Sequence, residues 1–170
     1  MRIGATALAV VVCWALTAGA ADDEKYTSKE GKFTIQFPKG AKVKTETKKS
    51  ADGNELHMTA TAEGKEKLYM VMYGDLPETV KNVPPKTFFD AAEKGGVERS
   101  KGKLVSSKDI EFGKNKLPGR EFVVEKDGNK IRSRTVLVDT RLYTVIVGGA
   151  KDFATTKEAT SFLDSFEITK

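Results

Sequence analysis

The side chain of this sequence best suited to acid–base chemistry is its single histidine, His57. A histidine works as a general base only beside a nucleophile and an orienting partner. The chain has no G-x-S-x-G segment, and no second histidine supports a metal site. In its predicted strand His57 alternates with Leu56 and Met58, which lie on the opposite face. We therefore interpret His57 as an incidental surface residue.

Thioether sulfurs could bind copper, because Met70 and Met72 share one face of a predicted strand. That strand, Leu68 to Tyr73, is apolar throughout, so we interpret the methionines as core packing. Two D-G-N segments, at residues 52–54 and 127–129, lack the further acids and the closing glutamate of a calcium loop. Turn chemistry explains both segments. The sequence predicts no metal and no cofactor.

Carboxylates offer a second kind of chemistry. A carboxylate-based hydrolase needs two acids whose pKa values are held apart in one pocket. The candidates are Glu121, Glu125 and Asp139. Nothing in the spacing of these acids requires a shared pocket, so we predict no catalytic residue.

Arginines gather in a predicted three-stranded meander at residues 119–149. If residues 127–128 form the first hairpin loop, Glu121 faces Arg134, and Arg132 lies on the same face. Opposite charges across strands contribute about 0.2–1 kcal/mol each. We interpret these arginines as charge partners of the glutamates, and we expect this end of the face to be solvent-exposed.

A lysine-rich segment gives the best indication of an interaction surface. Its lysines are Lys42, Lys44, Lys48 and Lys49. They could meet an anionic surface, or they could protect an edge strand from pairing with another sheet, and we favour edge protection. These lysines, with Arg132 and Arg134, are the weak candidates for ligand or partner binding. The candidate partners are another envelope protein or an anionic surface.

Composition limits the class of function. The chain has 170 residues and a formal net charge of +5. The charge is spread along the chain as lysine, which favours solubility. Nucleic-acid binding would need a denser basic stripe with aromatic platforms. We expect no nucleic-acid partner, and we expect a monomer.

The first residues, MRIGATALAVVVCWALTAGAADDE, are typical of a secretory signal peptide. Arg2 precedes an apolar stretch, and residues 18–20 fit the A-x-A cleavage pattern. Cleavage after Ala20 would leave residues 21–170 as a single domain in the periplasm or outside the cell. A retained membrane helix is the second interpretation, but the stretch is short for about 20 apolar residues. A lipoprotein acylated at Cys13 ranks third.

The rest of the chain predicts a mainly antiparallel sheet and two helices. The strand at residues 68–73 is apolar on both faces and must be covered on both. A mid-chain helix follows two prolines and should end at Gly95-Gly96. A second helix carries an apolar stripe from Ala159 to Phe166. With one helix on each side of the sheet, the expected fold is α+β, a three-layer α/β/α sandwich.

The order of these elements resembles the PsbP-like fold. The relevant segments are YTSKEGKFTIQFP near the start, GREFVVEKDGNKIRSRTVLVDTRLYTVIVGG, and FLDSFEI near the end. The resemblance covers most of residues 24–168. Proteins of that group, which includes small bacterial exported proteins and lipoproteins, are mostly binding or assembly proteins without a shared catalytic set. The resemblance therefore implies a fold rather than a ligand.

The function predicted from the sequence is an exported, non-catalytic binding or assembly module. The ligand is unknown. An envelope-associated structural protein is the first alternative, and a carboxylate-based hydrolase is the less favoured one.

Overall fold

The computed structural model describes residues 24–49, 55–63, 66–113 and 115–169. Two expectations from the sequence, the signal peptide at residues 1–20 and the turn at residues 52–54, lie outside these ranges. Within them, no helix is long and apolar enough to cross a membrane.

Most strands belong to one seven-stranded sheet in which every neighbouring pair is antiparallel. Its strands, in spatial order, are β3 (Lys44–Lys49), β4 (Glu55–Glu63), β5 (Lys67–Asp75), β9 (Arg141–Ala150), β8 (Asn129–Val138), β7 (Leu117–Lys126) and β6 (Lys103–Phe112). A second, three-stranded sheet contains β1 (Glu24–Ser28), β2 (Phe33–Phe37) and β10 (Glu167–Ile168). The sequence predicts a single sheet, and this separate sheet differs from that expectation.

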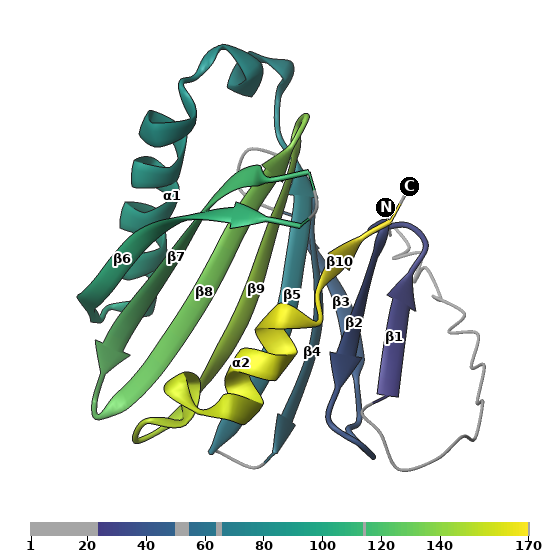
Figure 1. Ribbon diagram of the computed structural model, residues 1–170, viewed down its shortest axis with the longest axis vertical. Coiled ribbons are helices and arrows are strands. Elements are labelled where there is room, and N and C mark those ends of the chain that lie inside the picture. Colours follow the sequence, from purple (N-terminus) through teal and green to yellow (C-terminus); the bar gives the residue numbers. More distant parts are fainter. Residues whose placement is uncertain (1–23, 50–54, 64–65, 114, 170) are drawn as a thin grey trace, which may run out of the picture.

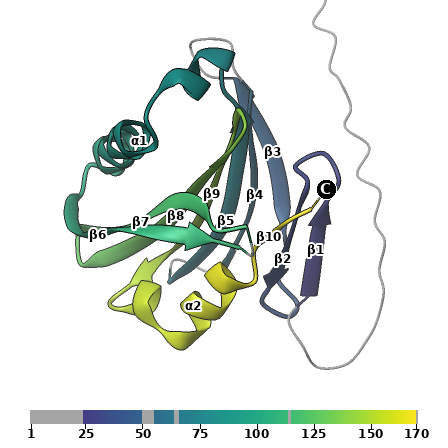
Figure 2. The ribbon, with the colours of Figure 1, turned by 45° about the horizontal axis from the view of Figure 1, so that its top comes forward.

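Two α-helices lie on opposite sides of the large sheet (Figures 1 and 2). The helix α1 (Pro85–Ser100) packs mainly on β7, and α2 (Lys157–Asp164) packs on β9 and β2. Two short 3-10 helices, η1 (Glu78–Asn82) and η2 (Phe153–Thr155), precede them. The small sheet shares the layer of α2. The predicted α+β architecture with three layers is confirmed.

The main core lies between the large sheet and the layer that contains α2. The large sheet contributes the alternate residues of β5 and β9, Tyr69, Val71, Tyr73, Tyr143, Val145 and Val147. Phe33, Ile35 and Phe37 of β2 fill the core from the other side, as their alternation predicts. The Tyr143 hydroxyl donates a hydrogen bond to the Gly31 carbonyl at 2.8 Å. This bond fastens the small sheet to the large one.

The predicted register of the β7–β8 hairpin is confirmed. Glu121 is paired with Arg134, and Val123 is paired with Arg132. The loop residues Asp127 and Gly128 have φ angles of 52° and 74°. Both values suit the tight turn that a D-G pair favours, and this local turn sets the register of the whole hairpin.

The predicted end of the mid-chain helix is wrong. We expected α1 to stop at Gly95-Gly96, but its last helical residue is Ser100. The next residue, Lys101, caps the helix in the left-handed conformation, with a φ of 53°. A Cβ atom on Gly96 would lie 2.8 Å from the ring of Phe122. Glycine is therefore needed here for a close approach of the helix to β7, and it does not terminate the helix.

Candidate functional site

The side of β5 that faces α1 is only half-covered. Leu68, Met70 and Met72 point to this side and are half-buried, whereas the alternate residues of the strand are buried in the core. The expectation that β5 is sealed on both faces is therefore wrong for one of them. The physical reason is the position of α1, which lies over β7 rather than over the centre of the sheet.

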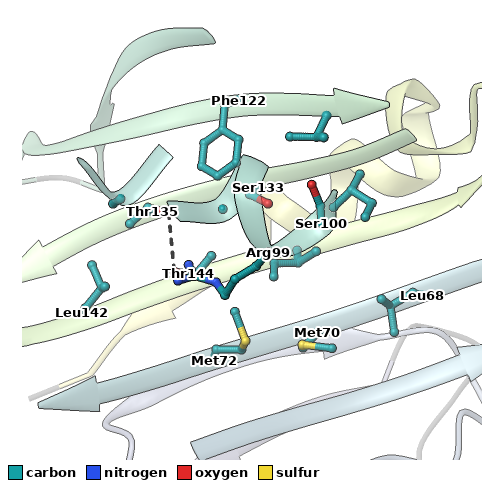
Figure 3. Close-up of a pocket in the computed structure, with 15 residues that line it drawn as sticks. Leu68, Met70, Met72, Arg99, Ser100, Phe122, Ser133, Thr135, Leu142 and Thr144 are labelled. Atoms are coloured by element: carbon teal, nitrogen blue, oxygen red, sulfur yellow. Dashed lines mark hydrogen bonds between the residues drawn. The ribbon is translucent and has the colours of Figure 1, made fainter. Parts of the chain in front are cut away.

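A groove of about 270 Å³ remains between α1 and the middle strands of the sheet (Figure 3). Its walls and floor are mainly apolar and include Leu68, Met70, Met72, Phe122, Leu142 and Ile146. Ligand sites in proteins are typically concave and mostly apolar, with a few polar groups that orient the ligand. This groove is the candidate functional site.

Hydroxyl groups interrupt the apolar floor. Ser133, Thr135 and Thr144 line the groove from β8 and β9. The side-chain oxygens of Thr135 and Thr144 lie 3.4 Å apart, as the dashed line in Figure 3 shows. Threonine and serine hydroxyls can both donate and accept hydrogen bonds, so the floor can also contact the polar part of a ligand.

The methionines belong to the same surface. Met58 of β4 is paired with Met72 of β5, and both are half-buried on the side of the sheet that faces α1. In the described part of the chain, no group of three histidine, cysteine, aspartate or glutamate residues could hold a metal ion. Because they are half-buried, the methionines form an adaptable apolar surface rather than the sealed core that we expected.

Arg120 fastens α1 beside the groove. It is 7% exposed and donates hydrogen bonds to Asp90 at 2.9 Å, Glu93 at 3.2 Å and Asp109 at 2.8 Å. Asp90 and Glu93 belong to α1, and Asp109 belongs to β6. Burial tends to lower the pKa of Arg120, but the three carboxylates outweigh burial and raise it. These contacts join α1 to β7 and β6 at the side of the groove.

Arg132 and Arg134 lie on the opposite side of the sheet and share one carboxylate. Arg132 donates to a Glu121 side-chain oxygen at 2.8 Å, and Arg134 donates to the same oxygen at 2.6 Å. Lys108 lies 3.1 Å from the other oxygen. Burial tends to raise the pKa of Glu121, but its hydrogen bonds to the three cations outweigh burial and lower the pKa to about 2.

The predicted exposure of this charge cluster is wrong. Glu121 is only 6% exposed, because α2 covers this end of the face. Arg132 donates to Thr160 of α2 at 3.1 Å, and Arg134 donates to Asp164 of α2 at 2.6 Å. Both arginines therefore join α2 to the sheet. Any role for them in ligand or partner binding remains a prediction.

The carboxylates proposed for a hydrolase do not form a pair. Glu121 is ionised and held by cations, whereas Glu125 and Asp139 are exposed. None of the three lines the groove. A general acid at neutral pH would need a raised pKa, and Glu121 has the opposite shift.

His57 is less exposed than predicted. Its side chain is 15% exposed and stacks on Tyr73 with ring centres 4.6 Å apart. Its Nδ1 atom lies 3.1 Å from the Thr47 hydroxyl. On the same side of the sheet, Arg141 donates to both carboxylate oxygens of Asp75 at 2.7 Å and to the Glu30 carbonyl at 2.8 Å. This cluster joins the small sheet to the end of β5 and lies on the face away from the groove.

The lysine-rich segment forms the edge of the large sheet. β3 is an edge strand, and its residues are exposed along its whole length. Lys44 is paired with Ala60 and Lys48 with Leu56, so both lie on the face that carries the groove. The position agrees with edge protection. Binding by these lysines remains a prediction.

The arrangement of the layers and strands defines a PsbP-like fold. Among solved structures, the chain is similar to the solution structure of cyanobacterial PsbP (CyanoP) from Synechocystis sp. PCC 6803, with a TM-score of 0.62 and 12% sequence identity. The match covers 88% of this chain and 94% of that chain. No protein-family model and no curated protein sequence matches the chain. The resemblance inferred from the sequence is thus confirmed for the fold.

Proposed function

We propose that the protein is an exported, non-catalytic binding module that holds a small apolar ligand in the groove beside α1. The observation that supports this function best is the half-exposed apolar floor formed by β5 and β9. The other face of the same strands is sealed by the core. A contiguous apolar patch that remains exposed on one face of a sheet is typical of a binding site.

The groove is built on rigid elements. Its floor is the centre of an antiparallel sheet, and its wall is a helix held by a buried arginine. A preformed site loses less conformational entropy when a ligand binds. This rigidity supports binding in the groove over a purely structural role for the exposed apolar residues.

A neutral fluorescent probe tests this function. We expect N-phenyl-1-naphthylamine to bind the wild-type protein with enhanced emission, because the groove excludes part of the water around an apolar ring. The variants Ile146→Trp and Met70→Trp place bulk on the groove floor and should each weaken binding at least about tenfold, a loss of about 1.4 kcal/mol. The measurement is a fluorescence titration, with urea unfolding to confirm that each variant is folded.

Val105→Trp is the matched control. Val105 is a strand residue of β6 that is 51% exposed and does not line the groove. The Val105→Trp variant should leave the affinity for the probe unchanged. The proposal fails if the probe does not bind the wild type, or if the control weakens binding as much as the groove variants do.

Export is a separate part of the proposal, and it rests on the residues before the described domain. We expect the chain expressed with all 170 residues in a bacterium to be recovered outside the cytoplasm. N-terminal sequencing should give Ala21 as its first residue, because signal peptidase cuts after an A-x-A pattern. Recovery of the full-length chain in the cytoplasm would contradict this prediction.

A further inference from the structure

The walls of the groove carry one positive charge. Among the described residues that line it, Arg99 of α1 alone is charged. Arg99 is exposed, and in the described part of the chain no carboxylate forms an ion pair with it. In this respect Arg99 differs from Arg120, Arg132, Arg134 and Arg141, each of which is paired with at least one carboxylate.

The local sequence leaves room for Arg99 at the groove. A Cβ atom on Gly95, one helical turn earlier, would lie 3.3 Å from the Nη1 atom of Arg99. The guanidinium therefore lies back along α1 over Gly95, where a larger residue would crowd it. In Figure 3 Arg99 extends from the helix over the floor that carries Met72 and Thr144. Its five N–H donors are thus available to a ligand at this site.

The groove is consequently amphipathic. Leu68, Met70 and Ile146 offer apolar surface, while Arg99 and the hydroxyl of Thr144 offer polar contacts. A ligand that matches these features has an apolar body and an anionic end. A neutral or cationic end would leave the Arg99 charge uncompensated.

The size of the groove limits the apolar body. A volume of about 270 Å³ is roughly nine times the ~30 Å³ that a water molecule occupies in the liquid. A methylene group needs a similar volume. The groove thus has room for a single alkyl chain of about eight to ten carbons, or for the first part of a longer chain.

We propose that the groove binds a single-chain amphiphile with an anionic head, with the chain on the Met70–Ile146 floor and the head at Arg99. This inference rests on the proposed function and names the class of ligand. Guanidinium groups form paired hydrogen bonds with carboxylates, so a fatty-acid-like carboxylate is the head group that fits best.

A set of ten-carbon ligands tests the head group. Decanoate, decanol and decyltrimethylammonium are titrated at neutral pH, below their micelle concentrations, against protein that carries N-phenyl-1-naphthylamine. We expect the affinity for decanoate, measured by displacement of the probe, to be about tenfold higher than the affinity for either of the other two ligands. Arg99→Gln should abolish the preference, so that this variant binds decanoate no more tightly than decanol.

Lys94→Gln is the matched control, because it removes the same charge from an exposed position of α1 that does not line the groove. It should leave the preference for decanoate intact. Equal displacement by all three ligands, or equal effects of Arg99→Gln and Lys94→Gln, would overturn the inference about the head group and leave groove binding standing. If the neutral probe itself fails to bind, the proposed function fails instead.

Discussion

Replacing Glu121 by glutamine is expected to lower the free energy of unfolding by about 3 kcal/mol at neutral pH, near the lower end of the roughly 3–5 kcal/mol range for breaking a buried ion pair. The substitution removes the charge that Arg132 and Arg134 share and leaves both guanidiniums beneath α2. Arg132 keeps its hydrogen bond to Thr160, and Arg134 keeps its hydrogen bond to Asp164. These remaining bonds limit the loss of stability. Urea unfolding monitored by circular dichroism measures the change.

Glu125→Gln provides the control for this effect. Glu125 lies four residues further along β7 on the same face, but it is exposed. Its replacement should change the free energy of unfolding by less than about 0.5 kcal/mol. If both variants lose the same stability, the loss reflects the general charge of the sheet rather than the buried cluster.

The same cluster predicts how stability depends on pH. The pKa of Glu121 is lowered to about 2 in the folded protein, from an unfolded value near 4.5, which corresponds to about 3 kcal/mol. A lowered carboxyl pKa stabilises the fold above the unfolded pKa, and this stabilisation is lost as the pH falls from about 4.5 to about 2. The stability difference between wild type and Glu121→Gln should therefore shrink over this range. A difference that stays constant down to pH 2 would contradict the assignment.

Local patterns were sufficient to predict part of this arrangement. The pairing of Glu121 with Arg134 follows from the turn at Asp127 and Gly128, because both partners lie within ten residues of that turn. The alternation of apolar residues likewise identified the core face of β2. These features depend on neighbours in the sequence, and the sequence therefore reports them directly.

Local patterns did not predict which helix covers which part of each face of the large sheet. Alternation shows which residues share a face of a strand, but it does not show what lies over that face. Glu121 was expected in solvent because nothing local places α2 above it. Met70 was expected in the core because nothing local places α1 to the side, over β7. Both outcomes depend on contacts between residues distant in the chain.

The candidate site was missed for this reason. The sequence predicts a strand sealed on both faces at residues 68–73 and a helix end at Gly95-Gly96. Glycine also permits a helix to approach a sheet closely, and Gly96 has that role here. A test of this close approach is also a test of how the groove is formed.

Gly96→Val is expected to lower the free energy of unfolding by about 2–3 kcal/mol, as overpacking of a close contact typically does. The new Cβ would lie 2.8 Å from the buried Phe122 ring, so either the ring or the helix must shift. Helix propensity does not explain such a loss, because valine is slightly better than glycine within a helix. Urea unfolding gives the stability, and N-phenyl-1-naphthylamine titration shows whether the groove changes when α1 is displaced.

Gly95→Val separates the contact from propensity. It makes the same substitution at the neighbouring position of α1, where the nearest atoms belong to the flexible end of Arg99. We expect a change in stability of less than about 0.5 kcal/mol. Equal effects at Gly95 and Gly96 would mean that the helix is not seated on Phe122. Because the groove exists only where α1 rests on β7 and leaves β5 open, that result would also remove the structural basis of the binding site.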